Sequence, residues 1–201
     1  MADPTPLGMA GFSCAVLLTS AGFAGVIPAS AMIESISPVG FLAGITLLLS
    51  STLHLASGNP VRTLVGTNFG VYGAYWMGIA AQTLRSGSED IQFVTWLRVP
   101  LAVYTAFAWV SSLFVSRAST FLFTTLEAEL VLLIAGALAP SDVLTRMGGW
   151  FGVTCALSGF YTCASLLLRL HVNIPLGAPF IKPFIIPKSE STIAILVADD
   201  T

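Results

Sequence analysis

The chain has 201 residues, a formal net charge of −2 and only 9% Asp, Glu, Lys and Arg, whereas ordinary soluble domains contain about a quarter. Its mean hydropathy is +0.88, and so few charges would not cover the surface of a soluble protein of this size. The shortage of Lys and Arg also leaves no basic patch that could bind nucleic acid. The composition therefore indicates an integral membrane protein that crosses the bilayer several times.

Six apolar segments are long enough to cross the ~30 Å hydrocarbon core of a bilayer as helices. In chain order they are Leu7–Ile27, Pro38–Ala56, Leu64–Leu84, Ile91–Val115, Thr120–Ala139 and Gly148–Leu170. The connections between them are short, which leaves no room for a soluble domain. We therefore predict an all-α membrane domain of six transmembrane helices over residues 1–179. Residues 180–201 are predicted to form a Pro-containing tail, because prolines favour an extended segment over a spanning helix.

An even number of spans places both termini on the same side of the membrane. Five basic residues fall on that side, namely Arg62, Arg117, Arg169, Lys182 and Lys188, and three on the other, namely Arg85, Arg98 and Arg146. Short cytoplasmic loops carry an excess of Lys and Arg. We therefore expect a multi-pass protein of the cell or inner membrane with both termini in the cytoplasm.

The first segment opens with a turn-like stretch, Asp3-Pro4-Thr5-Pro6-Leu7-Gly8. Asp is a favoured helix N-cap, and Pro is favoured at the first helical position. We therefore expect Asp3-Pro4 to start the first helix, with Pro6 in its first turn and Gly8 giving room to another backbone. The partial positive charge of a helix N-terminus favours an anion, although a plain helix start would explain the same residues.

Small residues are frequent in the third segment, where Gly66 and Gly70 form a GxxxG pattern and Gly73 follows. Lipid supplies no hydrophobic drive between helices, so close backbone approach at small residues is a main source of packing energy. We expect these glycines to lie at close helix contacts. The segment then either borders a narrow pathway or simply packs against a neighbouring helix.

Two acidic residues, Glu127 and Glu129, lie near the middle of the fifth segment. An acid inside a membrane span is costly and marks a candidate functional site. Two positions apart on a helix, the two side chains point about 200° from each other, so they cannot both line one pore. Arg98 is a candidate partner for either of them. The alternative role is structural hydrogen bonding, for example between protomers.

Four motifs together resemble the acetate uptake transporter family, the succinate–acetate permeases. They are "DPTPLGMAGF" at residues 3–12, "GTNFGVYGAYW" at Gly66–Trp76, "GGW" at Gly148–Trp150 and "IPLG" at Ile174–Gly177. The family signature is usually Asn-Pro-Ala-Pro-Leu-Gly-Leu, so this chain carries Asp3 in place of Asn and Thr5 in place of Ala. The resemblance covers residues 3 to 179, and the tail lies outside it.

The resemblance implies a six-helix protomer in a homo-hexameric ring, with a pore through each protomer for small carboxylates such as acetate or succinate. It implies a gate built from Phe12, Tyr72 and, by count along the fifth segment, Leu126. An apolar constriction too narrow and dry for water blocks ions, and the Tyr72 hydroxyl could donate to a carboxylate. The opening motif, namely Asp3, Pro4, Pro6, Leu7 and Gly8, would form the substrate entry.

Glu127, Glu129 and Asn68 are candidates for handling protons or substrate. We slightly favour Glu127 as the residue that faces the pore, because it stands beside Leu126. Acetate and succinate are ionised near neutral pH, so a pore-facing Glu127 must be protonated while they pass. Flux would then fall as pH rises.

The sequence contains no Ser–His–Asp order, phosphate loop or metal-ligand spacing, and its three cysteines lie in apolar stretches. We therefore expect no enzyme activity, no cofactor and no metal. The alternative to a passive or proton-coupled carboxylate transporter is a non-transporting subunit that retains the same fold within a larger membrane complex. The tail and the two altered motif residues motivate that alternative.

Overall fold

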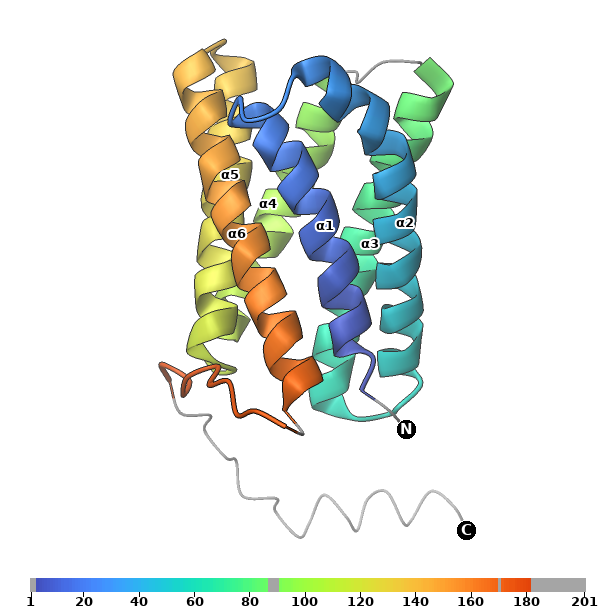
Figure 1. The fold of residues 1–201 in the computed structure, drawn as a ribbon, viewed down its shortest axis with the longest axis vertical. Helices are drawn as coiled ribbons and strands as arrows, with labels where there is room; N and C mark the ends of the chain where they lie inside the picture. Colours follow the sequence, from blue (N-terminus) through green and yellow to red (C-terminus); the bar gives the residue numbers. More distant parts are fainter. Residues whose placement is uncertain (1–2, 87–90, 170, 182–201) are drawn as a thin grey trace, which may run out of the picture.

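A computed structural model describes residues 3–86, 91–169 and 171–181 of the chain. Its helices are α1 (Thr5–Phe23), α2 (Ala29–Leu55), α3 (Pro60–Ser86), α4 (Ile91–Ser112), α5 (Arg117–Leu138) and α6 (Asp142–Leu168). Successive helices run in opposite directions (Figure 1), and no strand is found among the described residues. The prediction of a six-helix, all-α fold is confirmed.

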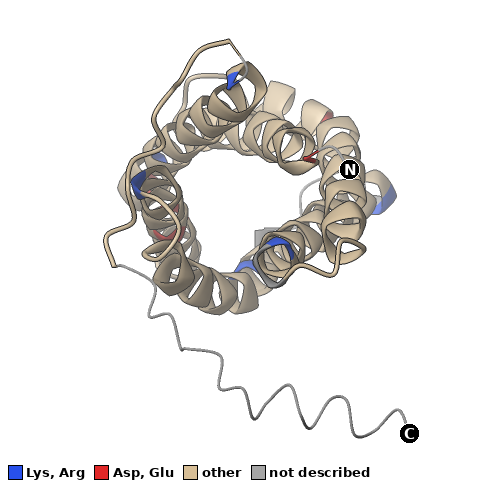
Figure 2. Cartoon of the chain, turned by 90° about the horizontal axis from the view of Figure 1, so that it is seen from below, with Lys and Arg blue, Asp and Glu red and all other residues tan. Residues whose placement is uncertain are grey.

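The helices stand in a ring that follows the order of the chain. Each helix packs against the next one, and α6 packs against α1, which closes the ring. Figure 2 shows this arrangement along the helix axes. The contact between α3 and α4 is among the smallest. Every helix therefore turns one face toward a common centre, and that centre is where a pathway through the protein would run.

Five helices are long and apolar enough to cross a membrane: α1, α2, residues Gln92–Ser112 of α4, α5 and α6. The remaining helix, α3, has 27 residues, or about 40 Å at 1.5 Å per residue. Polar residues such as Asn68 and Gln82 make it less apolar than its neighbours. Because α3 lies alongside α2 over much of its length, its place in the ring, rather than its composition, carries it across the same thickness.

The first helix ends earlier than the sequence predicted, at Phe23 rather than at Ile27. Gly25 adopts a φ of +79°, a conformation that glycine accepts readily. The Val26 N–H donates to the Ala21 carbonyl at 2.8 Å, and the Gly25 N–H donates to the Gly22 carbonyl at 3.0 Å. This pair of bonds is a Schellman motif, so a glycine stop precedes the proline that we expected to end the helix.

The second helix begins at Ala29, well before the predicted start at Pro38, which lies inside it. A proline within a helix removes one backbone hydrogen bond. Met32 and Ile36, which precede Pro38, are already buried on the inner side of the helix. The packing of this first part therefore outweighs the cost of the proline.

The fifth and sixth helices also begin earlier than predicted, at Arg117 and Asp142. In each case a serine caps the helix. Ser116 accepts from the Ser119 N–H at 3.1 Å, and Ser141 accepts from the Leu144 N–H at 3.4 Å. Hydropathy alone locates the apolar part of a helix and misses such polar first turns.

The glycines of α3 lie against α2, as a close helix contact requires. An added Cβ at Gly66 would lie 3.1 Å from the Ser51 carbonyl oxygen, and one at Gly73 would lie 2.9 Å from Leu48 Cγ. At Gly70 the nearest atom is the Ser51 hydroxyl, at 3.0 Å. That hydroxyl donates to the Gly66 carbonyl at 2.7 Å, which ties the two helices together.

Candidate functional site

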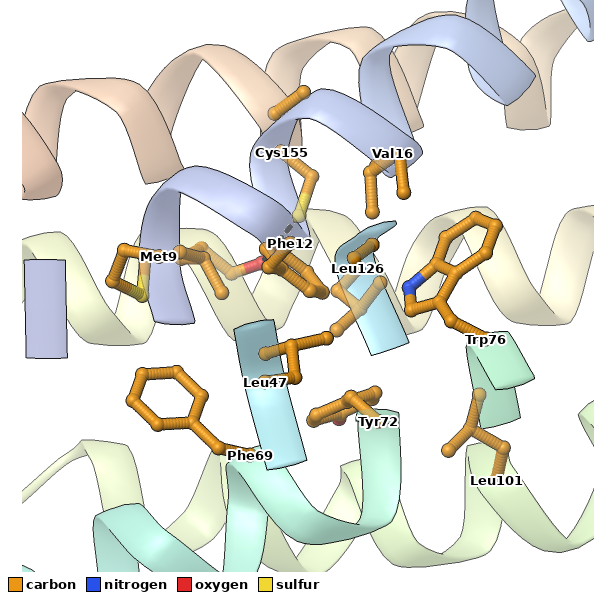
Figure 3. Close-up of a cluster of buried hydrophobic side chains, with 14 of the residues drawn as sticks. Met9, Phe12, Val16, Leu47, Phe69, Tyr72, Trp76, Leu101, Leu126 and Cys155 are labelled. Atoms are coloured by element: carbon orange, nitrogen blue, oxygen red, sulfur yellow. Dashed lines mark hydrogen bonds between the residues drawn. The ribbon is translucent and has the colours of Figure 1, made fainter. Parts of the chain in front are cut away.

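Three large side chains from alternate helices meet at the centre of the ring. Phe12 of α1, Tyr72 of α3 and Leu126 of α5 are each 4% exposed and belong to one apolar cluster. The rings of Phe12 and Tyr72 touch edge to face, with centroids 5.7 Å apart. Figure 3 shows the three side chains together within this cluster. The structure thus brings together the three residues that the resemblance assigned to a gate, and we call them the constriction.

The Tyr72 hydroxyl is held by α4. It lies 2.8 Å from the Thr105 hydroxyl, and Thr105 donates to the Leu101 carbonyl at 2.7 Å. Because the Thr105 proton is used in that bond, Tyr72 must donate to Thr105. The phenol is therefore not free to donate to a carboxylate in this conformation, contrary to what the sequence suggested.

A wide cavity of about 430 Å³ lies between the constriction and the end of the bundle where α1 begins. Hydroxyl groups gather around it, from Thr5, Ser111, Ser112, Ser116, Ser119 and Thr162. Asn68 also lines this cavity, and its side-chain oxygen accepts from the Tyr104 hydroxyl at 2.5 Å. This bond leaves the Asn68 amide nitrogen as a donor toward the cavity. Several of the hydroxyls already donate to backbone carbonyls of their own helices, as those of Ser111, Ser112 and Thr162 do. The Asn68 amide is therefore the clearer neutral donor to a carboxylate in this cavity.

The opening motif anchors α1 to its neighbours. The helix begins at Thr5, one residue later than predicted, and Asp3 precedes the N-cap position. Even so, the Asp3 carboxylate accepts from the Thr5 N–H at 3.0 Å and from the Thr5 hydroxyl at 2.6 Å. The Pro4 carbonyl accepts from Ser50 of α2 at 2.7 Å. The motif therefore fixes where the first helix starts.

The charge of Asp3 is stabilised at this end of the bundle. Burial raises the pKa of the Asp3 carboxyl, but the hydrogen bonds from Thr5 and the nearby charge of Arg169 lower it more, so its net pKa lies below the usual value. The Arg169 guanidinium lies 3.7 Å from the carboxylate. Thr5 also lies 3.1 Å from Nε2 of the buried His54. Asp3 is accordingly ionised at neutral pH.

The five motif residues predicted to form the substrate entry do not line the described cavities. Leu7 is 40% exposed and points outward. Gly8 packs on Phe69, because an added Cβ there would lie 2.7 Å from the Phe69 ring. The cavity is instead lined by Thr5 and Met9, which are spaced one helical turn apart. In the described structure the motif holds the start of α1 against its neighbours, and its role as a substrate entry stays a prediction.

A much narrower cavity lies on the other side of the constriction, with a volume of about 30 Å³, which is room for a water molecule or two. The three constriction residues line it together with Arg98 and Glu129. Glu129 accepts from the Ser20 hydroxyl at 2.6 Å. The Arg98 guanidinium lies 5.0 Å from the centroid of the Phe23 ring.

Glu129 lines this cavity, and Glu127 is not among its lining residues. A helix turns by about 100° per residue, so Glu129 comes back to the side of Leu126, whereas Glu127 lies about a quarter turn away from Leu126. Glu127 nevertheless interacts electrostatically with Tyr72 of the constriction, so the preference for Glu127 as the pore-facing acid stays a prediction. Glu127 is half-buried, and its Oε2 has no hydrogen-bond partner. Arg98, which the sequence suggested as a candidate partner for either acid, lines the same cavity as Glu129.

Several residues of the site were not identified from the sequence. They are the hydroxyls of Thr5, Ser20, Tyr104 and Thr105, which orient the functional side chains. Serine and threonine within spans often bond to their own helix, so no local signal marks the few that reach across. Among the described residues, no group of three or more His, Cys, Asp and Glu side chains could hold a metal ion.

Comparison with known proteins gives one family and several relatives. The model of the GPR1/FUN34/yaaH family matches residues 1–175. The succinate-acetate/proton symporter SatP of Escherichia coli (strain K12) is 28% identical over 185 residues, which is 88% of this chain and 96% of that protein. An uncharacterized protein of Methanothermobacter thermautotrophicus is 25% identical over 80% of this chain and 82% of its own length.

A solved structure has the same fold. The structure of the bacterial acetate channel SatP matches 88% of this chain and 99% of its own, with a TM-score of 0.78 and 24% sequence identity.

Proposed function

The chain belongs to the GPR1/FUN34/yaaH family, and we propose that it carries small carboxylates such as acetate or succinate across a membrane. The family that the sequence motifs suggested is confirmed. The printed names of its relatives are a succinate-acetate/proton symporter and an acetate channel. Both names describe passage of a small carboxylate, and neither describes catalysis.

The observation that carries the proposal is the constriction between two cavities on the axis of the ring. A carboxylate would enter the wide cavity, pass Phe12, Tyr72 and Leu126, and continue through the narrow one. A dry apolar constriction holds back ions and water until its side chains move. In this proposal the constriction is the gate of the pathway, and its three side chains must move before a carboxylate can pass.

The membrane placement follows from composition and charge. Both ends of the helical domain, at Thr5 and Leu168, lie at the same end of the bundle. Arg62, Arg117 and Arg169 lie at that end, and Lys182 and Lys188 lie outside the described residues. This excess of positive charge supports the proposal that this end lies in the cytoplasm.

We further propose that six copies form a ring in the membrane, each with its own pathway. The resemblance to the carboxylate transporter family supports this assembly. The outward faces of the helices carry large apolar side chains, such as Phe107, which is 72% exposed, and Leu84, which is 70% exposed. Lipid or a neighbouring copy must cover these faces. The mass of the detergent-solubilised complex, measured with the detergent contribution subtracted, gives the number of copies.

A non-transporting subunit is the second candidate, because the narrow cavity holds only a water molecule or two in this conformation. Purified protein in liposomes separates the two functions. We expect uptake of labelled acetate well above that of protein-free liposomes, at a pH where little neutral acetic acid crosses lipid. Leu126→Trp should abolish this uptake by filling the constriction. Val131→Trp, on the outward side of the same helix and 51% exposed, should leave it unchanged.

Uptake equal to that of protein-free liposomes would refute transport and favour the structural subunit. Co-purification of the native protein with other membrane subunits would then identify the complex.

A further inference from the structure

The narrow cavity contains two side chains of opposite charge that are nearly fully buried. Arg98 of α4 is 7% exposed and Glu129 of α5 is 6% exposed. Both line the same cavity as Phe12, Tyr72 and Leu126. A charge at this depth is costly unless another charge or a set of hydrogen bonds compensates it. Because the two residues attract each other electrostatically, each one offsets the burial of the other.

The protein is shaped to hold the Glu129 carboxyl group in this place. Ser20 of α1 donates to its Oε1 at 2.6 Å. Gly152 of α6 faces the same group, and an added Cβ at that position would collide with the carboxyl and with the Ser20 hydroxyl. Three helices thus make room for this acid and orient it. Simple filling of a helix interface would require none of these features.

Arg98 is suited to bind a substrate carboxylate. A guanidinium forms two parallel hydrogen bonds with a carboxylate, which makes this pair stronger than contacts to neutral donors. Arg98 lies directly beyond the constriction, on the route from the wide cavity. Glu129 occupies the position of a competing carboxylate that belongs to the protein itself.

We propose that Arg98 is the carboxylate-binding group of the pathway and that Glu129 controls it by gaining and losing a proton. With Glu129 ionised, its charge offsets that of Arg98 and the site does not hold substrate. When Glu129 takes a proton from the solution on the entry side, the charge of Arg98 becomes available to the incoming carboxylate. On the exit side Glu129 releases that proton and Arg98 releases the carboxylate. One proton and one monocarboxylate therefore cross together without net charge.

The groups around Glu129 are consistent with this role. From α4 it faces Arg98 and from α6 the thiol of Cys155, and Tyr72 of α3 lines the same cavity. Cys155 donates to the Leu122 carbonyl at 3.6 Å, so it remains a neutral thiol. The contact from α1 is the Ser20 hydroxyl. Among the residues that the structure describes, Arg98 is thus a charged neighbour that responds when Glu129 gains or loses its proton.

The inference rests on the proposed transport function, and binding of acetate tests it without any flux. We suggest calorimetric titration of the detergent-solubilised protein with acetate, in two buffers that differ in their heat of ionisation. The difference between the two heats gives the protons taken up for each acetate bound. Wild-type protein should take up protons at a pH where Glu129 is ionised before acetate binds.

Glu129→Gln should bind acetate without proton uptake, because Gln resembles the protonated acid. Glu127→Gln is the matched control on the same helix and should behave like the wild type. Arg98→Met should weaken acetate binding by about tenfold or more, since it removes the charged partner. If Arg98→Met does not fold, Arg98→Lys, which keeps the charge and loses the planar fork, should still weaken binding measurably.

Unchanged proton uptake in Glu129→Gln, or unchanged affinity in a folded Arg98 variant, would overturn the inference while leaving transport intact. Absence of both acetate binding and acetate flux in the wild-type protein would instead refute the proposed function itself.

Discussion

The two cavities on either side of the constriction differ in size and in the groups that line them. The wide cavity, at the end where α1 begins, holds about 430 Å³ and is surrounded by hydroxyls and the Asn68 amide. The narrow one holds about 30 Å³ and contains Arg98 and Glu129. A carboxylate in the wide cavity meets apolar side chains and uncharged polar groups such as the Asn68 amide, whereas in the narrow one it meets a cation and a competing acid. Entry of a carboxylate into the wide cavity depends on the space there. Its entry into the narrow cavity depends on the charges of Arg98 and Glu129.

The largest loss of stability should come from removing only one of the two charged side chains, Arg98 and Glu129. Glu129→Ala removes the buried negative charge that offsets Arg98 and the acceptor of the Ser20 hydrogen bond, and loss of one member of a buried charge pair should lower the free energy of unfolding by about 3–5 kcal/mol. Asn68→Ala, the corresponding truncation in the wide cavity, should cost about 1 kcal/mol, since Asn68 has a single neutral hydrogen bond. Thermal unfolding in detergent measures both. Equal losses would contradict the difference between the two cavities.

The constriction separates the two cavities, so truncating one of its side chains should connect them. Leu126→Ala removes one of the three side chains that meet there and should raise acetate flux severalfold in liposomes. The matched control is Leu130→Ala, one turn further along α5, which lines the narrow cavity beyond the constriction. Leu130→Ala should enlarge that cavity without opening the gate. If both variants gave the wild-type flux, the rate-limiting barrier would lie elsewhere.

Two glycines of α3 differ in the room that they leave for an added methyl group, which tests how closely this helix packs. Gly73→Ala places a methyl group 2.9 Å from Leu48 Cγ, and overpacking of this kind costs about 1–3 kcal/mol. Gly78→Ala, on the same helix, meets only Leu97 at 3.7 Å, so it should be neutral or slightly stabilising. The contact of α3 with its neighbours is therefore tight at Gly73 and leaves room for a methyl group at Gly78. A loss of stability in Gly78→Ala equal to that in Gly73→Ala would contradict this view.

The smallest effect concerns Asp3 at the wide end. Asp3→Asn keeps an acceptor for Thr5 and removes a negative charge, so the fold should persist and anion flux should stay equal or rise. The folded-state pKa of Asp3 is lowered from 3.8, so its contribution to stability is present above that value and is lost as pH falls through the folded pKa. Wild-type protein should therefore lose slightly more stability in acid than Asp3→Asn. A large loss of flux in Asp3→Asn would show that the carboxylate has a specific role in transport.

The sequence predicted the elements of the fold better than their ends. Six apolar segments were sufficient to give six helices, because burial in lipid requires length and hydropathy that the sequence displays directly. The polar first turns capped by Ser116 and Ser141, and the continuation of α2 through Pro38, depend on local bonds and tertiary packing. Hydropathy carries neither kind of information.

The candidate site was predicted unevenly for a similar reason. Phe12 and Tyr72 lie in recognisable motifs, and the structure brings them together with Leu126. The choice between Glu127 and Glu129 required the rotation of α5 about its axis, which adjacency to Leu126 does not give. The hydroxyls of Ser20 and Thr105 act across helices, and only the packing of the ring identifies their partners.

The most direct test of a carboxylate pathway through the ring is to block it from inside. Asn68→Cys in a variant that has Ala at Cys14, Cys155 and Cys163 places one thiol in the wide cavity. A negatively charged methanethiosulfonate reagent attached there should abolish acetate flux into liposomes. The same reagent attached at Thr67→Cys, an exposed neighbour on α3, should leave the flux unchanged. Full modification of Asn68→Cys, verified by mass, with undiminished acetate flux would contradict a pathway through the centre of the ring.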